Sequence, residues 1–574
     1  MIGRIPIADI SPVVYFGGEF VHVKAIPGEE ITIAATVIRE SDAAFGAYVI
    51  LFDSVGKEIA RVEMYEIWPK SDRYKGTLAL PKTGDYTFCI EARDETTTPQ
   101  LLSRSEFFPL RADRERALVG AWYEFFPRSE GATKNASGTF ATAAQRLPDI
   151  AAMGFDVIYL PPVHPIGHSH RKGANNSLSA RPEDPGVPWA IGNKDGGHDA
   201  INPDLGTLAD FEQFVSSAKK VGLEVAMDLA LQTSPDHPWV KEHPNWFTHR
   251  SDGTIAYAEN PPKKYQDIYP LNFDQDYEGL LQEVLRIIRF WIAKGVTLFR
   301  VDNPHTKPVH FWHELLTVIH NESPEIIFLA EAFTRPAMMQ ALAKAGFHQS
   351  YTYFTWRTTK QEIISYGNEV AQETSAFFRP NFWVNTPDIL PFHLQSGIPA
   401  MFALRAVLAA TLAPSWGMYA GYELFEHRPS NEGGEEYLTS EKYQIRIRDW
   451  DGAQKKGLSL APFITQLNQI RRAHPALQRL RNLVFHHTDS DAIIAYSKRA
   501  GSDLLLVVVN LDPTVAQETT VHWDMSALGL NKDSFTVTDL LDGSTFSWSA
   551  QTFIHLDPNK PTGKVAHIAH VEMS

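Results

Sequence analysis

The pattern of apolar and polar residues changes character twice along the chain. Up to about residue 112, short stretches alternate between apolar and polar side chains, and turns rich in glycine, aspartate and lysine separate them. Such alternation is typical of strands with one buried face. We therefore predict a small β-sandwich over 1–112. Its predicted strands are 20–26, 31–39, 47–52 and 86–92, and the threonine-rich stretch 94–100 is predicted as a loop or linker.

Beyond Val119, short runs that are apolar throughout alternate with stretches of helical periodicity. Strands that are buried on both faces and followed by helices are typical of a parallel sheet. The predicted strands are 120–125, 157–160, 225–229, 297–301, 326–330, 350–354, 382–385 and 418–419. The predicted helices include 139–153, 208–221, 279–294, 308–321, 336–345 and 359–372. Eight strand–helix units predict a (β/α)₈ barrel, also called a TIM barrel.

A doubly wound open sheet is the alternative for this middle region. Such sheets usually carry a glycine-rich phosphate loop after the first strand, but the sequence contains neither a G-x-G-x-x-G motif nor a P-loop. We predict the barrel over 113–476. Two connections, 161–207 and 230–278, are far longer than ordinary turns, and loops that follow barrel strands build the active-site face.

Near Leu477 the pattern returns to short strands. Strands are predicted over 492–496, 504–510 and 535–540, which indicates a C-terminal β-sandwich over 477–574. The predicted fold class is therefore multi-domain, combining α/β and all-β parts, with a central barrel flanked by two β-sandwiches.

Composition excludes several classes of function. The 574 residues are 44% hydrophobic and 21% charged, as in ordinary folded proteins. A formal net charge of −15 disfavours nucleic acid and anionic membranes as partners. The single cysteine, Cys89, excludes a disulfide within the chain and a multi-cysteine metal site. With no leader pattern and no run of about 18 apolar residues, we expect a cytoplasmic protein.

Four acidic residues stand at the ends of predicted barrel strands. Asp228 ends VAMD, Asp302 ends LFRVD, Glu331 ends IIFLAE and Asp388 ends WVNTPD. A carboxylate at the end of an apolar strand is costly to bury alone, so we expect these groups to have a function. The 29 residues from Asp302 to Glu331 span about one βαβ unit, which predicts neighbouring strand ends on one rim.

Two juxtaposed carboxylates suit glycosidic bond chemistry, in which one attacks the anomeric carbon and the other transfers a proton to and from oxygen. Arg300 lies two residues before Asp302, on the same face of the strand, and its cation favours the ionised, nucleophilic form of Asp302. Glu331 follows an apolar run near other carboxylates, and both effects would raise its pKa, as an acid catalyst requires. Taken singly, each acid is better explained as a helix cap or as part of a surface ion pair. Together with Arg300 they favour an active site.

Several strings resemble a known superfamily and, within it, one family. The strings HDAINPDLGT (198–207), FRVDN (299–303), LAEAF (329–333) and NTPD (385–388) resemble the α-amylase superfamily. Further strings resemble the bacterial α-1,4-glucan:maltose-1-phosphate maltosyltransferase family: AWYEFFPRS (121–129), YLPPVHPIG (159–167), HRKGANNS (170–177), ENPPKKYQDIYPLNFD (259–274), RVDNPHTKP (300–308) and FTWRTT (354–359). This resemblance covers nearly the whole chain.

The resemblance implies a retaining glycosyltransferase. A maltosyl unit would move from α-maltose 1-phosphate to the non-reducing end of a linear α-1,4-glucan acceptor, with release of inorganic phosphate, in glycogen-like α-glucan biosynthesis. By the same match, Asp302 would be the nucleophile that forms a β-maltosyl-enzyme intermediate. Glu331 would act first as acid and then as base, and Asp388 would hydrogen-bond the sugar hydroxyls and favour ring distortion.

The resemblance also implies a set of substrate-binding residues, namely Lys172, Gln232, Asn260, Lys263, Tyr265, Arg300 and Asn303. Lysine supplies a point charge for phosphate, and asparagine and tyrosine supply neutral donors. An amylase has no use for a cation where its leaving sugar sits, so Lys263 favours a phosphorylated donor. Without the resemblance, Lys263 and Lys264 read equally well as a solvated pair on a loop.

We expect no catalytic metal and no organic cofactor. The histidines near the loop after the second strand match no zinc signature in their spacing, so sugar contacts or structural hydrogen bonds are favoured for them. The histidines near this loop are His164, His168, His170 and His198. Two others, His237 and His305, are expected to be structural.

The sequence departs from its relatives' usual pattern at two points. Pro387 stands where the superfamily often has histidine before the last catalytic aspartate, and this agrees with the maltosyltransferase pattern. Members of the family usually carry a helical insertion associated with the N-terminal sandwich and used in dimerisation. Here the stretch between the last predicted strand and the barrel is short, so we expect the insertion to be missing or reduced. Whether the protein forms a homodimer is left open by the sequence; a homodimer would have an altered interface.

Two other functions share part of this interpretation. An α-glucan hydrolase or a trehalose-type isomerase would use the same three carboxylates and would act without phosphate. A carbohydrate-binding protein on an inactive barrel would be indicated by the loss of one of the three, and Asp302, Glu331 and Asp388 are all present.

Overall fold

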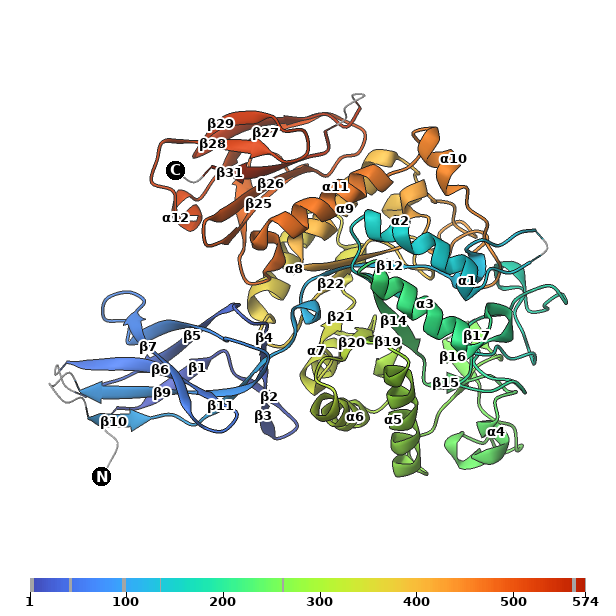
Figure 1. Cartoon of the computed structure of the whole chain (residues 1–574). Coiled ribbons are helices and arrows are strands. Elements are labelled where there is room, and N and C mark those ends of the chain that lie inside the picture. Colours follow the sequence, from blue (N-terminus) through green and yellow to red (C-terminus); the bar gives the residue numbers. More distant parts are fainter. Residues whose placement is uncertain are drawn as a thin grey trace.

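The computed structural model describes residues 5–40, 44–94, 100–134, 136–260, 263–559 and 564–572, with the backbone alone at 260 and 263. Figure 1 shows a central barrel and two β-sheets, one from each end of the chain, that lie to the same side of it. The predicted fold class is confirmed. The predicted loop at 94–100 falls almost wholly outside the described residues.

Eight parallel strands form the barrel. In chain order they are β12 (Gly120–Glu124), β13 (Val157–Leu160), β14 (Glu224–Leu229), β19 (Leu298–Asp302), β20 (Ile327–Glu331), β21 (Gln349–Ser350), β22 (Asn381–Trp383) and β23 (Ser415–Tyr419). The sheet runs β21-β20-β19-β14-β13-β12-β23-β22, so the first strand in the chain, β12, pairs with the last, β23. A parallel bridge between Ser350 and Pro380 joins the two ends of this sheet. Strands β12, β13, β19, β20 and β23 bury every residue, which explains their continuous apolar runs.

Helices surround the barrel and connect its strands. They are α1 (Phe140–Ala143), α2 (Leu147–Ala152), α3 (Leu208–Lys220), α5 (Tyr277–Ala293), α6 (Val309–Glu322), α7 (Pro336–Ala345), α8 (Lys360–Asn368), α9 (Pro399–Leu412), α10 (Trp450–Lys455) and α11 (Ala461–Ala473). Helix α3 begins at a capping box in which Thr207 and Asp210 each bond the other's backbone N–H. Within the described ranges, no helix is long and apolar enough to cross a membrane.

Several predicted elements differ from the structure. The predicted strand 20–26 is interrupted at His22, because Glu19–Val21 belongs to a separate hairpin and Val23–Ala25 to the N-terminal sheet. The predicted strand 350–354 ends at Ser350, and Tyr353–Trp356 forms a 3₁₀ turn whose first residue follows the capping side chain of Thr352. A short apolar run does not by itself distinguish a strand from a buried turn. The predicted helix 139–153 is two short helices, because Pro148 has no N–H to continue the helical hydrogen bonds.

The two long connections carry small elements of their own. The connection 161–207 contains the 3₁₀ turns Ala174–Asn176 and Pro203–Leu205. The connection 230–278 contains α4 (Trp239–Glu242) and two short antiparallel strand pairs. These are β15 (Gln232–Thr233) with β18 (Tyr269–Pro270), and the hairpin of β16 (Ala258–Asn260) with β17 (Lys263–Tyr265). Residues from both connections line the same cavity as the strand-end carboxylates, so they wall the mouth of the barrel.

The N-terminal sheet has nine strands, in the order β1-β5-β8-β7-β6-β9-β11-β4 with β10 beside β9. Its strands are β1 (Ile7–Ser11), β4 (Val23–Ala25), β5 (Glu30–Val37), β6 (Phe45–Asp53), β7 (Glu58–Glu66), β8 (Arg73–Ala79), β9 (Gly84–Asp94), β10 (Leu101–Arg104) and β11 (Phe108–Ala112), and β2 (Val14–Phe16) and β3 (Glu19–Val21) form a separate hairpin. In β5, Ile31, Ile33, Ala35 and Val37 are buried at every second position, as the alternation predicts. The predicted domain boundaries at 112 and 476 stay predictions.

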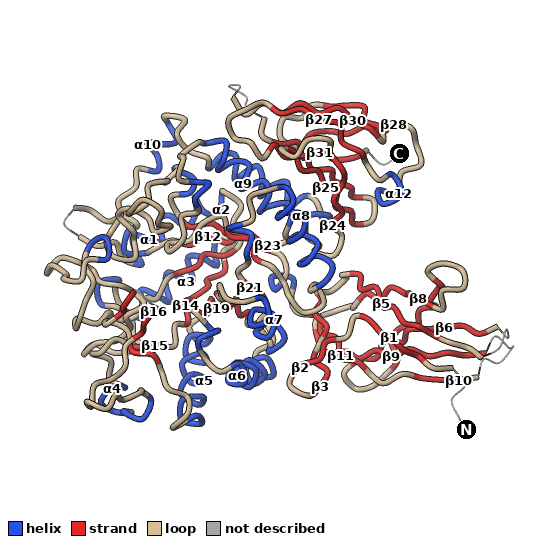
Figure 2. Tube along the Cα trace, turned by 180° about the vertical axis from the view of Figure 1, so that it is seen from behind, coloured by secondary structure: helices blue, strands red, loops and turns tan. Residues whose placement is uncertain are grey.

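The C-terminal sheet packs on the barrel through one face and on its own core through the other. Its strands are β24 (Leu483–Thr488), β25 (Ile493–Ala500), β26 (Asp503–Asn510), β27 (Gln517–His522), β28 (Ser534–Asp539), β29 (Thr545–Ser549), β30 (Gln551–Leu556) and β31 (Ala566–Val571), and α12 (Met525–Leu528) lies among them. Leu505 and Val507 join the core of the barrel, whereas Leu504 and Leu506 join a separate core. Seen from behind, β24 and β25 lie beside α8 and α9 (Figure 2).

A buried ion pair fastens the N-terminal sheet to the barrel. Arg379, just before β22, donates to Asp113 at 2.6 Å and to the backbone carbonyl of Ala25 at 2.7 Å. Both charged side chains are almost inaccessible to solvent, at 2% and 3% exposed. Removing one partner of such a pair leaves the other charge buried without compensation.

We predict that Arg379→Met lowers the free energy of unfolding by about 3–5 kcal/mol, because it leaves the Asp113 carboxylate unpaired in the interior. Arg289→Met is the matched control, since Arg289 pairs with Glu322 at 2.7 Å while both side chains are more than 40% exposed. We expect this control to cost less than about 1 kcal/mol. Urea unfolding followed by tryptophan fluorescence measures both, and equal losses would contradict the assignment.

Candidate active site

Three of the predicted carboxylates line one cavity. Asp302 and Glu331 are the last residues of β19 and β20 and lie directly opposite one another in the sheet. Asp388 stands in the turn that follows β22, where its backbone N–H bonds the Thr386 hydroxyl. All three line a cavity of about 710 Å³ at the carboxyl ends of the strands. This is the face on which barrel enzymes build their active sites.

Arg300 connects the carboxylates from below. Its Nη1 lies 2.9 Å from an oxygen of Asp302 and 2.9 Å from an oxygen of Asp228, and its Nη2 lies 3.1 Å from Glu331. The guanidinium is 5% exposed, so these interactions take place away from solvent. A planar group with several fixed donors can hold three carboxylates apart in this way, which a lysine could not.

Two further acids lie beneath the cavity and do not line it. Asp228 accepts hydrogen bonds from the Tyr159 hydroxyl at 2.5 Å and from the Trp189 indole at 3.1 Å. Burial, reinforced by the nearby Asp302 carboxylate, raises the pKa of Asp228 against the opposing effect of Arg300. Burial also raises the pKa of Glu124, at the end of β12, well above its usual range. A neutral Glu124 adds no negative charge to the crowded site.

The environment of Glu331 differs from that of its neighbour Asp302. Burial is the main cause that raises the pKa of Glu331; Arg300 opposes it, and the Asp302 and Asp388 carboxylates add to it. The backbone N–H of Asn303 donates to Glu331 at 3.3 Å and fixes its orientation. The raised pKa favours a protonated Glu331, and both groups share Arg300, which lies 2.9 Å from Asp302 and 3.1 Å from Glu331. Two carboxyl groups with such different environments can serve as acid and nucleophile.

The turn after Asp302 has an unusual backbone. Asn303 adopts a left-handed conformation, with φ 43° and ψ 53°, and its side-chain amide lies 3.5 Å from Asp302. Asparagine tolerates this conformation better than most residues. The Lys307 ammonium donates to the carbonyls of Asp302 and Asn303 at 3.4 and 3.2 Å. Lys307 is buried and lines the cavity, and burial lowers its pKa.

The predicted substrate-binding residues Lys172, Gln232, Tyr265 and Asn303 also line the cavity. Asn260 and Lys263 are paired in register at the end of the hairpin of β16 and β17. Their side chains lie outside the described residues. Ala258, Glu259 and Tyr265 of the same hairpin line the cavity, so the hairpin forms one of its walls.

Sequence reasoning missed Lys442, which forms an ion pair with Asp388. Burial lowers the pKa of Lys442, but the Asp388 carboxylate outweighs this and raises it well above its ordinary value. The loop that carries Lys442 is anchored by the preceding residue, because the buried carboxylate of Glu441 accepts from Arg448 at 2.8 Å. No motif around position 442 marks it, since its partner lies 54 residues earlier in the chain.

Two more cavity residues, Tyr443 and Asp267, were also missed. Asp267 is 2% exposed, and one of its oxygens has no hydrogen-bond partner. Burial raises the pKa of Asp267. A buried carboxyl with an unused oxygen at the cavity wall is suited to bind a sugar hydroxyl.

The histidines near the cavity are mostly structural. His198 lies 3.2 Å from His237 through ring nitrogens, bonds the Ala230 carbonyl at 2.8 Å and stacks on Trp239. Burial lowers the pKa of His198 to about 4, so its ring is neutral at neutral pH. His168 and His170 are exposed. Of the predicted histidines only His305 belongs to the described lining of the cavity.

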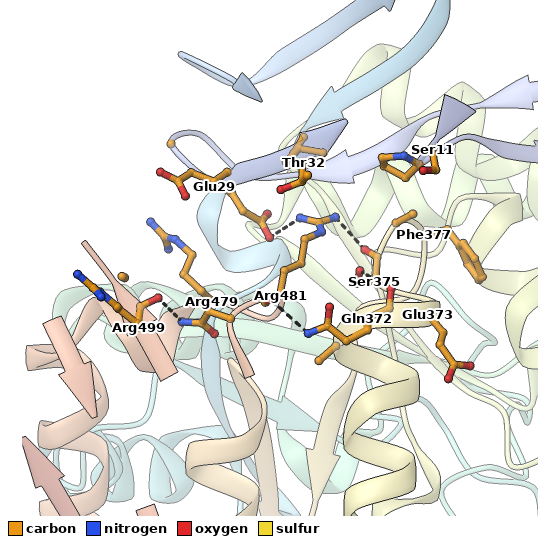
Figure 3. A pocket seen from close by; sticks show the side chains of 18 of the residues that line it. Ser11, Glu29, Thr32, Gln372, Glu373, Ser375, Phe377, Arg479, Arg481 and Arg499 are labelled. Atoms are coloured by element: carbon orange, nitrogen blue, oxygen red, sulfur yellow. Dashed lines mark hydrogen bonds and ion pairs between the residues drawn. The ribbon is translucent and has the colours of Figure 1, made fainter. Parts of the chain in front are cut away.

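A second cavity of similar size, about 730 Å³, lies where the N-terminal sheet, the segment 371–377 and the segment 479–482 meet (Figure 3). The guanidinium at the centre of this cavity, that of Arg481, already has partners within the protein. It donates to Glu29 at 2.5 Å and to the Ser375 carbonyl at 2.8 Å, as the dashed lines in Figure 3 show. These bonds hold three parts of the chain together. The strand-end carboxylates belong to the other cavity, which we therefore take as the active site.

The raised pKa of Glu331 predicts a specific pH dependence of stability. A carboxyl whose pKa is raised on folding binds more protons folded than unfolded above the ordinary carboxyl range, so its contribution to stability falls as pH rises. Glu331→Gln removes this loss. We predict that the stability of this variant relative to wild type increases by about 1 kcal/mol or more from pH 5 to pH 8, since one pKa unit corresponds to about 1.4 kcal/mol.

Urea unfolding at both pH values measures this difference. Glu322→Gln is the control, because Glu322 is exposed and the Arg289 hydrogen bond lowers its pKa. The control should show no such increase with pH. A Glu331→Gln variant whose relative stability stays level or falls as pH rises would contradict a protonated Glu331.

Comparison with protein families assigns most of the chain. Residues 3–99 match the model described as α-1,4-glucan:maltose-1-phosphate maltosyltransferase, domain N/S. Residues 124–281 match the α-amylase catalytic domain, and residues 485–571 match the model described as GLGE, C-terminal.

Curated relatives carry the same name. The chain is 51% identical to α-1,4-glucan:maltose-1-phosphate maltosyltransferase 2 of Streptomyces coelicolor, over 99% of this chain and 96% of that protein. It is 57% identical to the maltosyltransferase of Mycolicibacterium smegmatis, over 83% of this chain and 68% of that protein. The first alignment spans 646 positions against 574 residues here, so that relative has segments without a counterpart in this chain.

Solved structures show the same fold at low identity. A cyclomaltodextrinase matches with a TM-score of 0.63 and 16% identity, over 96% of this chain and 97% of that chain. The maltogenic α-amylase AmyB of Thermotoga neapolitana matches with a TM-score of 0.61 and 19% identity, over 80% of this chain and 99% of that chain.

Proposed function

The chain belongs to the α-1,4-glucan:maltose-1-phosphate maltosyltransferase family of the α-amylase superfamily, and from this premise we propose that it transfers a maltosyl unit from α-maltose 1-phosphate to the non-reducing end of an α-1,4-glucan. Inorganic phosphate is the second product. The observation that supports this most directly is the pair of adjacent strand-end carboxylates, Asp302 and Glu331, joined by Arg300 in one cavity. A cytoplasmic location stays a prediction of the sequence.

The first half of the reaction forms an enzyme-bound sugar. A carboxylate oxygen of Asp302 attacks the anomeric carbon, and the bond from that carbon to the phosphate oxygen breaks. Glu331, protonated by its buried setting, gives its proton to the departing phosphate. The product is a β-maltosyl ester of Asp302. Arg300, 2.9 Å from Asp302, holds the carboxylate in place for the attack.

The second half returns the sugar to an α linkage. Glu331, now ionised, takes the proton from the acceptor hydroxyl, whose oxygen attacks the anomeric carbon and releases Asp302. Two inversions at one carbon retain the configuration. Asp388 accepts hydrogen bonds from the sugar hydroxyls, and its ion pair with Lys442 holds the side chain in position for that role.

The cavity supplies cations for a phosphorylated donor. Lys172, Lys307 and Lys442 line it among the described residues, and the hairpin that carries Lys263 forms one wall. We propose that Asn260, Lys263, Tyr265 and Asn303 bind the phosphate. Lys172 and Gln232 would contact the donor sugar. A hydrolase acting on neutral glucans would need no cation at the position of its leaving group.

We predict that Asp302→Asn abolishes phosphate release from α-maltose 1-phosphate, with a loss of at least about 10⁴-fold, because a neutral amide cannot act as nucleophile. Asp451→Asn, at an exposed position in α10, is the control and should retain wild-type turnover. Circular dichroism checks that both variants fold. Turnover that survives in Asp302→Asn would remove Asp302 from the role of nucleophile.

We predict that Lys442→Met lowers kcat/KM by about 10–100-fold, because Asp388 loses the ion-pair partner that holds its side chain in position. Each factor of ten corresponds to about 1.4 kcal/mol. Lys442→Arg should recover part of the activity. Lys294→Met, which removes a surface pair with Glu212 at 2.8 Å, is the control. Initial rates over a range of donor concentrations measure all three, and equal values for Lys442→Met and Lys294→Met would contradict the assignment.

A further inference from the structure

Three side chains from distant parts of the chain bring ligand atoms together where α11 meets the C-terminal sheet. They are His474, which follows the last residue of α11, Asp503, which begins β26, and His570, in β31. One ring nitrogen of each histidine and one oxygen of the aspartate all lie within 4.8 Å of one another. The cluster belongs to neither of the two large cavities. The 3₁₀ turn Pro475–Gln478, which follows α11, contacts β25 and β26.

Strand alternation explains why the ligands face one point. Leu505 and Val507 of β26 face the barrel, and Asp503 has the same parity, so it faces the barrel too. His570 pairs in register with Leu505 and has the parity of Ile568, another barrel-facing residue. The same face of the sheet therefore presents a carboxylate and an imidazole to the end of α11, where His474 lies.

The distances approach those of a metal site. Asp503 Oδ1 lies 3.4 Å from His570 Nε2 and 2.8 Å from His474 Nδ1. Bonds of about 2.0–2.2 Å to zinc place neighbouring tetrahedral ligands about 3.3–3.5 Å apart. The first distance matches this range. The second is a hydrogen bond whose proton a metal would displace, and the two atoms would then move apart by about half an ångström.

The aspartate is held for this role by its second oxygen. Asp503 Oδ2 accepts the backbone N–H of Ala476 at 2.8 Å, which leaves Oδ1 to face the two histidines. Second partners that orient a ligand in this way accompany most metal sites. The side chains are partly shielded, with His474 and Asp503 both 15% exposed and His570 33% exposed, so an ion could enter and still be enclosed on several sides.

Two other histidine–aspartate clusters among the described residues are less suitable. In the cluster of Asp113, His320 and His348, the His348 Nδ1 accepts the Phe328 backbone N–H at 3.1 Å, so the nitrogen that faces Asp113 carries a proton. Arg379 already occupies Asp113 at 2.6 Å. The cluster of His487, Asp489 and His522 is 35–72% exposed, so its side chains lose more freedom on binding an ion.

We propose that His474, Asp503 and His570 bind one divalent ion of the zinc class and that this ion ties the C-terminal sheet to the last helix of the barrel. Two imidazoles and one carboxylate suit Zn²⁺, Co²⁺ or Ni²⁺ and not Mg²⁺ or Ca²⁺, which prefer oxygen ligands alone. Three protein ligands leave the fourth tetrahedral position to water. The ion takes no part in maltosyl transfer, because its ligands lie outside the active-site cavity.

Titration of Zn²⁺ into tag-free, chelator-treated full-length protein tests this site. The variants are Asp503→Asn and His570→Gln, which keep the size of each side chain, and Asp503→Asn can still accept the Ala476 N–H. His522→Gln, from the exposed cluster, is the matched control. We expect wild type and His522→Gln to bind one equivalent, with affinity at least tenfold weaker in Asp503→Asn and His570→Gln.

Two further readouts separate a metal site from a hydrogen-bonded cluster. Zn²⁺ should raise the unfolding temperature of wild type and His522→Gln but not of Asp503→Asn, because an ion that binds only the folded chain stabilises it. Co²⁺ bound to wild type should give the visible absorption of a tetrahedral site with nitrogen and oxygen ligands. Asp503→Asn should not give this absorption. Maltosyl transfer should be equal in all variants. Zinc affinity equal in wild type, Asp503→Asn and His570→Gln, or none in wild type, would overturn the proposal.

Discussion

The active site depends on one buried guanidinium. Arg300 lies within 3.1 Å of three carboxyl groups, and neither it nor they reach solvent to any large extent. Three acids so close together cannot all ionise in a low-dielectric interior, and none could stay charged there alone. Arg300 supplies the one positive charge that these groups share, and burial raises the pKa values of Glu331 and Asp228. The proposed division of labour between nucleophile and acid rests on this arrangement.

The third carboxylate is supported from the opposite wall. Among the described residues, the ion-pair partner of Asp388 is Lys442 and not Arg300. The loop that carries Lys442 is anchored by the ion pair of Glu441 with Arg448. The site therefore contains two separate ion-paired units, one at the base and one at the mouth. A sugar that lies between them meets a fixed charge on either side, and fixed charges need little reorganisation as the transition state forms.

Much of the fold was predictable because the barrel strands bury both faces. Continuous apolar runs in β19 and β20 identify them, and an acid at the end of each run indicates a functional rim. The same reasoning failed at 350–354, where an aromatic run forms a turn capped by Thr352. The apolar residues indicate burial in both cases, and periodicity over so few residues does not distinguish a buried strand from a buried turn.

The site residues that were not predicted depend on contacts between distant segments of the chain. Lys442 reaches Asp388 from a loop with no regular structure, and Lys307 acts through the carbonyls of Asp302 and Asn303. Neither relation leaves a periodic signal in the sequence, because both depend on how loops return to the rim. The Arg379–Asp113 pair that fastens the N-terminal sheet is invisible for the same reason, since its partners are 266 residues apart.

The central claim is that Asp302 passes a maltosyl unit from phosphate to a glucan without releasing it to water. The most direct measurement is phosphate release from α-maltose 1-phosphate with and without a maltooligosaccharide acceptor, with the product lengths read by mass spectrometry. The account predicts phosphate release that depends on the acceptor and products that lengthen in steps of two glucose units. Cleavage of the oligosaccharide without phosphate release, or free maltose as the main product, would contradict it.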